Sequence, residues 1–124
     1  MPTGDLFPTA YLAEIINERD ATRRSAAIER LIHPDICHVS FDRAVYGRVA
    51  FEHRVDAMVA VMTPSTHASL RGTPRIDGDS VFFQWQLSDG DDHSIATGGA
   101  FVVLTAGLAT WFYATLNLEG PPDA

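Results

Sequence analysis

Four long runs of strand-forming residues, separated only by short turns, fill the second half of this sequence and constrain its fold more than any other feature. The expected strands cover residues 67–76, 80–87, 93–104 and 108–118. The turns contain residues that tight hairpins prefer, and Asp77-Gly78 is the clearest signal. Such strands run roughly 25–35 Å at ~3.3 Å per residue. Long sheets twist, and we expect bulges near Gly72-Thr73-Pro74 and Gly98-Gly99 to bend this antiparallel meander further.

The first half has helical periodicity, interrupted by one short alternating stretch. Asp20 is placed to cap a helix that Pro34 cannot continue, and Gly47 precedes the next apolar stripe. The expected helices cover residues 10–19, 21–32 and 48–62, and the expected strand covers residues 36–41. The fold class is therefore predicted as α+β, with three N-terminal helices packed on a strongly bent mixed or antiparallel sheet.

Composition narrows the class of protein. The sequence has 124 residues, the size of one domain, so residues 1–124 are expected to form a single unit. A net charge of −7, with only nine Lys and Arg residues, argues against nucleic acid and against a membrane as partners. No secretory signal is recognisable and the lone Cys37 cannot form an internal disulfide, so a cytoplasmic location is expected. The five histidines lack metal-ligand spacing, and no metal site is expected.

Several short motifs, in this order of elements, resemble one known superfamily. The motifs are Arg30-Leu31-Ile32-His33-Pro34-Asp35 before the first strand, Tyr46-Gly47-Arg48 at the third helix, Thr66-His67 through Ile76-Asp77-Gly78-Asp79, and Gly98-Gly99-Ala100-Phe101. The chain resembles the nuclear-transport-factor-2-like superfamily, and within it the SnoaL-like and ketosteroid-isomerase-like branch. The resemblance implies a cystatin-like roll with a cone-shaped pocket, a homodimer formed through the outer sheet face, and no metal or organic cofactor.

The resemblance does not extend to the residues by which ketosteroid isomerase moves protons. When the family pattern is laid over this sequence, its two carboxyl positions fall on Ser40 and Gly99. The position of its helix-one tyrosine falls near Leu12, with Tyr11 one step away. Steroid isomerisation by that mechanism is therefore not expected.

The same superposition predicts which side chains face the pocket, because alternate residues of a strand point to opposite sides. The strand residues expected to face inward are Ile36, His38, Ser40, Phe82, Gln84, Gln86, Thr97, Gly99, Phe101, Val103, Phe112, Ala114 and Leu116, with Tyr11, Tyr46 and His67 near the mouth. The opposite set is expected to form the dimer interface and comprises Phe83, Trp85, Leu87, Val102, Leu104, Trp111 and Tyr113.

Three of these residues are candidates for catalysis, and the two histidines among them also have alternative roles. His38 is the best candidate for general acid and base catalysis, since an ordinary imidazole titrates near neutral pH. Its alternative is a half-buried histidine bonded to a neighbouring hydroxyl. Ser40, two residues along the strand, is the second candidate. His67 is the third, with a solvated residue at the start of a strand as its alternative.

The remaining pocket residues are predicted to bind a small hydrophobic molecule. The expected ligand contacts are Tyr11, Tyr46, Phe82, Gln84, Gln86, Thr97, Phe101 and Phe112. Three functions stay open on this evidence. The first is a cofactor-free lyase, isomerase or cyclase acting on a ring compound. The second is a ligand-binding protein without chemistry, and the third is a dimeric interaction module that has no substrate.

Overall fold

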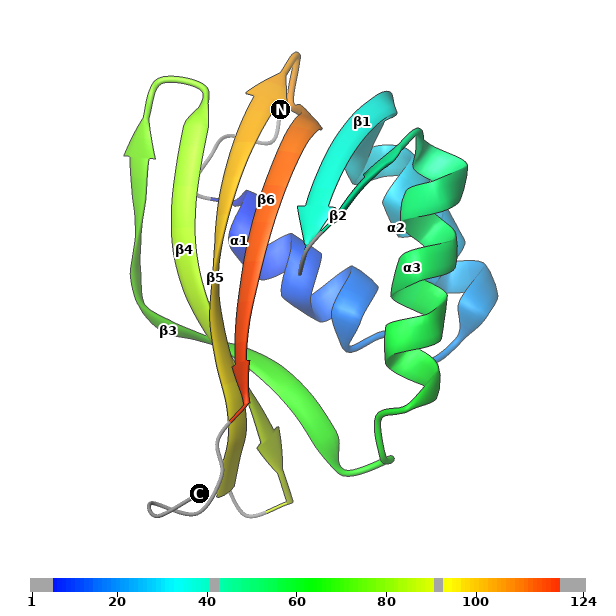
Figure 1. The fold of residues 1–124 in the computed structure, drawn as a ribbon, viewed down its shortest axis with the longest axis vertical. Coiled ribbons are helices and arrows are strands. Elements are labelled where there is room, and N and C mark those ends of the chain that lie inside the picture. Colours follow the sequence, from blue (N-terminus) through cyan, green and yellow to red (C-terminus); the bar gives the residue numbers. More distant parts are fainter. Residues whose placement is uncertain (1–5, 41–42, 91–92, 119–124) are drawn as a thin grey trace.

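The computed structural model describes residues 6–40, 43–90 and 93–118, which form helices packed on one mixed sheet (Figure 1). The helical segments are α1 (Phe7–Tyr11), the π-helical η1 (Leu12–Ile16), α2 (Ala21–Leu31) and α3 (Arg48–Ala60). The strands are β1 (Ile32–Ser40), β2 (Arg43–Tyr46), β3 (Thr66–Asp77), β4 (Ser80–Asp89), β5 (His93–Thr105) and β6 (Leu108–Leu118).

Local hydrogen bonds set the end of the first helical segment and the start of α2. α1 continues directly into η1, whose wider turn is closed by a 2.8 Å hydrogen bond from the Asn17 amide to the Leu12 carbonyl. This first segment spans residues 7–16 rather than the expected 10–19. The Asp20 side chain accepts a hydrogen bond from the Arg23 amide, which confirms the predicted cap of α2. Pro34 lies within β1, since the chain is already extended from Ile32.

The sheet has the strand order β2-β1-β6-β5-β4-β3. The predicted meander of four long antiparallel strands is confirmed as β3 to β6, and β1 pairs in parallel with β6. Arg43–Tyr46, where no element was expected, returns along β1 as strand β2. The end of the predicted first strand, Phe41, lies outside the described residues.

The helices cover one face of the sheet, and no other helix or strand of the described chain covers the opposite face (Figure 1). The predicted α+β class is confirmed, although α3 follows β1 and β2 and is not N-terminal to the whole sheet. Between the two layers lies a continuous cluster of buried apolar side chains. The space that was expected to be the pocket of a cone therefore holds the hydrophobic core.

One of the two predicted sheet irregularities is confirmed. The register between β3 and β4 shifts between Arg71 and Arg75, at the expected Gly72-Thr73-Pro74 bulge. At Gly98 and Gly99 the pairing is regular on both sides, so the predicted bulge there is wrong. A Cβ atom on Gly98 would lie 2.3 Å from the Trp85 indole, which shows that glycine is present there to admit the ring.

An unpredicted bulge near the β5–β6 turn reverses the faces of two strands. Leu104 pairs with Ala109 but Val103 pairs with Trp111, so Thr110 is one extra residue on β6. The Thr110 hydroxyl donates to the Val103 carbonyl at 3.2 Å and stabilises this extra residue. Side chains alternate between the two faces of a strand, so one inserted residue on β6 moves every β5 side chain to the face opposite the one predicted. The side chains of β4, which pairs with β5 in register, change face in the same way.

The predicted facing of β4 and β5 is therefore wrong, whereas that of β1 and β6 is confirmed. The residues of β4 and β5 whose side chains face the helices are Val81, Phe83, Trp85, Leu87, Ala96, Ala100, Val102 and Leu104. The residues that were expected to face inward and instead face outward are Phe82, Gln84, Gln86, Thr97, Gly99, Phe101 and Val103.

Two polar contacts fix the helices to the rest of the fold. The Asn17 side chain makes a pair of hydrogen bonds with the backbone of Ala68 on edge strand β3, at 2.8 Å and 2.7 Å. Arg24 of α2, 5% exposed, binds Asp56 of α3 through Nε and Nη2 at 3.1 Å and 3.0 Å.

None of the helices in the described ranges has the length and apolarity needed to cross a membrane.

Candidate ligand-binding site

His38 is the buried titratable side chain on the inner face of the sheet. It lies on β1 and is 5% exposed. Its imidazole makes edge-on contacts with Phe51 of α3 and Phe112 of β6, with ring centroids 5.0 Å and 5.2 Å apart. The predicted inward orientation of His38 is confirmed, but its neighbours are aromatic rings rather than a hydroxyl.

Burial, together with Arg54 of α3, determines the charge of His38, and the contact with Arg54 determines its tautomer. Burial in the apolar cluster, together with the nearby Arg54 guanidinium, lowers the pKa of His38 from 6.5 to about 4. The imidazole is therefore neutral at pH 7. Arg54 Nη1 lies 3.4 Å from His38 Nδ1, and a guanidinium can only donate, so Nδ1 accepts and the proton resides on Nε2. His38 thus presents an N–H donor from its second nitrogen.

Tyr11 is the second polar group in this interior. It lies on α1 and is 7% exposed, with its ring 4.9 Å from Phe112 and 6.1 Å from Phe83 by centroid. Burial raises the pKa of the Tyr11 phenol well above its usual value, because a phenolate would lose its hydration. The hydroxyl therefore stays protonated near neutral pH, and it can donate a hydrogen bond.

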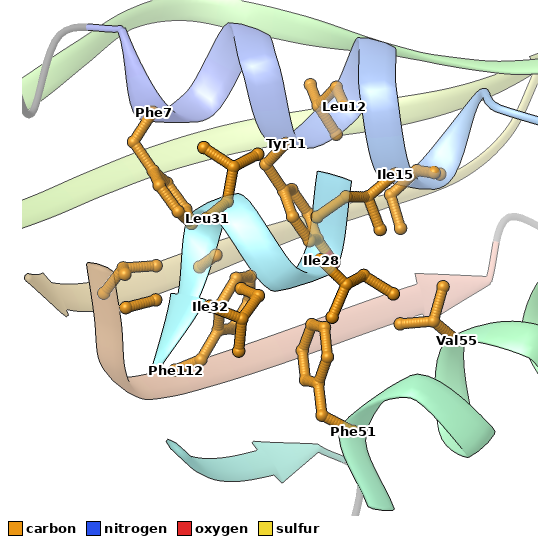
Figure 2. Close-up of a cluster of buried hydrophobic side chains, with 14 of the residues drawn as sticks. Phe7, Tyr11, Leu12, Ile15, Ile28, Leu31, Ile32, Phe51, Val55 and Phe112 are labelled. Carbon is orange, nitrogen blue, oxygen red and sulfur yellow. The ribbon is translucent and has the colours of Figure 1, made fainter. Parts of the chain in front are cut away.

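The Phe112 ring contacts both of these polar groups. Figure 2 shows Phe112 of β6 and Phe51 of α3 directed into the same apolar cluster as Tyr11 and Phe7 of α1. Since both Tyr11 and His38 contact the Phe112 ring, one aromatic side chain separates the two donors. Tyr11, His38 and Phe112 are thus the predicted site residues that the fold brings together.

The other predicted polar residues do not join this group. Ser40 is half-buried at the end of β1, on the same face as His38 by alternation. His67 lies between the buried residues Thr66 and Ala68, so its side chain faces away from the helices. Tyr46 is 72% exposed on β2 and is not part of the buried cluster around His38.

The predicted ligand contacts on β4 and β5 lie on the outer face because of the Thr110 bulge. Phe82 and Phe101 pair with each other across the strands and are 41% and 42% exposed. Gln84 is exposed, and Gln86 donates to Ser88 on its own strand at 3.4 Å. The same face holds Thr97 opposite Gln86. These residues cannot reach a molecule bound next to His38.

Sequence reasoning overlooked Arg54 and misplaced Phe83. Arg54 lies three residues after Phe51, so it shares the helical face of a residue that was expected to be buried. That spacing is the signal that could have identified it. Phe83 belongs to the face with more apolar residues on β4, which is the face that a core normally takes.

An open hollow of about 540 Å³ lies next to this cluster, outside the predicted pocket. Its lining residues are Leu6, Ala10, Glu14, Arg30, Leu31, Ala106, Gly107 and Leu108. Leu31 lines the hollow and also belongs to the buried core. Leu31 is therefore a side chain that the hollow and the core share.

The outer sheet face has exposed aromatic residues. Phe82, Phe101 and Tyr113 lie side by side on β4, β5 and β6, with Trp111 in the next row. Trp111 and Tyr113 are 42% and 47% exposed. The expectation that Trp85 shares this face is wrong, since Trp85 packs against the core.

Comparison with known proteins identifies the fold. No family model matches the sequence, and no curated protein matches it. A protein from Agrobacterium tumefaciens, proposed to be an isomerase of the SnoaL-like family, aligns with a TM-score of 0.82 and 25% identity over 92% of this chain and 97% of its own. A proposed ketosteroid isomerase from Kribbella flavida aligns with a TM-score of 0.68 and 17% identity, over 96% of this chain and 82% of its own. A proposed SnoaL-like polyketide cyclase from Jannaschia sp. aligns with a TM-score of 0.69 and 13% identity, over 96% of this chain and 93% of its own.

These likenesses agree with one another across nearly the whole chain. The two neighbours below 25% identity support the fold alone, whereas the Agrobacterium protein also reaches 25% identity. The resemblance expected from the sequence motifs is confirmed by solved structures of SnoaL-like, ketosteroid-isomerase-like and nuclear-transport-factor-2-like proteins. The chain has the fold of the nuclear-transport-factor-2-like superfamily, and its structural neighbours include the SnoaL-like and ketosteroid-isomerase-like proteins of that superfamily.

Proposed function

We propose that the protein binds a small apolar ring compound through a carbonyl oxygen, which accepts hydrogen bonds from the Tyr11 hydroxyl and His38 Nε2–H. The observation that supports this is the presence of two neutral donors against one ring, Phe112, inside an aromatic cluster. A phenol and an imidazole in an apolar cluster carry a desolvation cost that phenylalanine would avoid, and a ligand that accepts from both would offset that cost. The ligand would reach them past Leu31, from the adjacent hollow.

Holding a carbonyl is better supported than abstracting a proton. With Nδ1 engaged by Arg54 and the proton on Nε2, His38 is suited to polarise an oxygen rather than to act as a base. The buried polar residues of the described chain are Arg24, His38, Thr66 and Ser88, and no carboxylate is among them. The binding function is therefore the main proposal.

A matched pair of ring compounds tests this proposal. We expect 1-tetralone, which has a carbonyl, to bind more tightly than tetralin, which lacks one. Tyr11→Phe removes one donor and should weaken tetralone binding by roughly 3- to 10-fold while leaving tetralin unchanged. In the complex the carbonyl stretching frequency of tetralone should fall, and it should recover partly in Tyr11→Phe. Equal affinity for the two compounds in the wild type would contradict the proposal.

Cofactor-free isomerisation is a second candidate, favoured by the proposed isomerase at 25% identity. Two donors that hold a carbonyl also stabilise the enolate that an isomerase or cyclase forms. Exchange of the α-hydrogens of 1-tetralone with deuterium oxide measures that step directly. Exchange that is faster with wild type than with His38→Phe or Tyr11→Phe would establish it. Exchange at the buffer rate would leave binding as the function.

We also propose that a homodimer forms through the outer sheet face. The supporting observation is the row of exposed aromatic side chains from Phe82 through Phe101 to Tyr113, with Trp111 beside it. Phe101→Lys should dissociate the dimer in sedimentation velocity, whereas Val49→Lys, at an exposed position of α3, should not. A stable wild-type monomer at micromolar concentration would refute this interface, and with it the interaction module as an alternative function.

A further inference from the structure

The hollow beside the core has two chemically different parts. Its apolar part is formed by one face of α1, the end of α2 and the turn between β5 and β6, which contribute Leu6, Ala10, Leu31 and Leu108. Its polar part consists of Glu14 and Arg30, which form an ion pair with each other. With about 540 Å³ it falls within the size range of small-molecule sites.

The ion pair decides which class of molecule this hollow accepts. The Glu14 and Arg30 side chains are 47% and 55% exposed, so each keeps hydrogen-bonding atoms directed to solvent. An anion would have to compete with Glu14 for the guanidinium, in a protein of net charge −7, and a cation would have to compete with Arg30. A neutral group with an adjacent donor and acceptor, such as an amide, complements both partners at once.

The tight turn between β5 and β6 forms one wall of this hollow. Ala106 has a φ of 52°, and it is the non-glycine residue with positive φ in the described ranges. Alanine is disfavoured in that conformation, which asparagine adopts more readily. Positive φ at both Ala106 and Gly107 is the geometry of a two-residue hairpin turn, and the small side chain at position 106 leaves this side of the hollow open. Ala10 and Gly107 are also small, so three lining positions leave the space open.

We propose that this hollow is a binding site for a neutral amphipathic molecule, whose apolar rings pack on Ala10 and Leu108 and whose amide bridges Glu14 and Arg30. This site is distinct from the donors in the interior. Its occupancy does not require His38 or Tyr11.

The test is an amide NMR titration of the full chain with three probes that share a bicyclic body. 2-Naphthamide is expected to bind roughly tenfold more tightly than naphthalene, and more tightly than 2-naphthoate, with shifts centred on Ala10 and Gly107. Glu14→Gln removes the competing carboxylate and should reverse the preference, so that 2-naphthoate binds more tightly than 2-naphthamide. This variant changes an exposed side chain and keeps the fold available for the comparison.

Two further variants separate the hollow from other sites. Ala10→Phe fills the hollow and should weaken 2-naphthamide binding at least tenfold, whereas Ala57→Phe, at an exposed position of α3, should leave it unchanged. His38→Phe removes a donor of the interior site, and the shifts of Ala10 and Gly107 on titration with 2-naphthamide should stay as in the wild type. The proposal is overturned if 2-naphthamide does not saturate the wild type, if Glu14→Gln does not alter the order of the probes, or if Ala10→Phe binds as the wild type does.

Discussion

The buried imidazole of His38 predicts a specific loss of stability in mild acid. Its pKa is about 4 in the folded protein and near 6.5 in an unfolded chain. Between these values the unfolded chain binds a proton that the folded protein does not, so lowering the pH favours unfolding. Above pH 6.5 both states are neutral at this position, and the contribution of His38 no longer changes. Stability is thus lost as the pH falls from about 6.5 to about 4.

The size of this effect follows from the separation of the two pKa values. They differ by roughly 2.5 units, and each unit corresponds to about 1.36 kcal/mol, so the loss is roughly 3 kcal/mol. The assay is urea unfolding, followed by circular dichroism, at a series of pH values from 7.5 to 4. The quantity to compare is the free energy of unfolding of the wild type minus that of His38→Phe at each pH, because the other titrating groups are common to both.

Two outcomes decide the matter. The wild type should lose roughly 3 kcal/mol relative to His38→Phe between pH 6.5 and pH 4, with equal denaturant slopes for the two proteins. Arg54→Met removes the adjacent positive charge, so it should raise the pKa of His38 and make this loss smaller. A difference between wild type and His38→Phe that is constant with pH would refute the claim that the imidazole is buried and neutral.

Two further predictions concern the framework around the site. Gly98→Ala would place a Cβ atom 2.2 Å from a β6 carbonyl oxygen and should destabilise the fold by at least about 1–3 kcal/mol in urea unfolding, whereas at Gly99 the nearest atom is 3.6 Å away and Gly99→Ala should cost much less. Asn17→Ala breaks both hydrogen bonds to Ala68 and should cost about 1–3 kcal/mol, with Asn117→Ala, on an exposed position of β6, as the control. Equal costs within either pair would contradict the packing described.

The order of elements could be predicted because each signal was local. The cap at Asp20, the hairpin at Asp77-Gly78 and the bulge at Gly72-Thr73-Pro74 depend on a few adjacent residues, and all three are confirmed. Strand β2 was overlooked for the same reason. Its four residues, Arg43–Tyr46, lack a pattern of their own and become a strand only because β1 offers an edge for pairing.

The candidate site could be predicted only where register was not interrupted. β1 and β6 were assigned correctly, and they contribute His38 and Phe112. The hairpin between β5 and β6 was treated as regular, in which case Phe101 would share a face with Phe112. The extra Thr110 places Phe101 on the opposite face from Phe112. The sequence has no signature for this extra residue, because its stabilising contact is made to the Val103 carbonyl on the neighbouring strand. One residue thus moved every predicted ligand contact on two strands to the wrong face.

The correct faces nevertheless make the interior more selective than the predicted pocket was. A cavity with exposed amides such as Gln84 and Gln86 would accept many polar molecules, and water would satisfy those amides when no ligand is bound. In the proposed binding mode a ligand next to Phe112 meets aromatic rings, and Tyr11 and His38 are the donors that contact the same ring. In the proposed binding mode a molecule without an acceptor forgoes the hydrogen bonds from both donors, and a charged molecule loses its hydration on entering an apolar cluster. The proposed binding mode therefore favours neutral carbonyl compounds, and replacing either donor with phenylalanine should broaden binding as it weakens it.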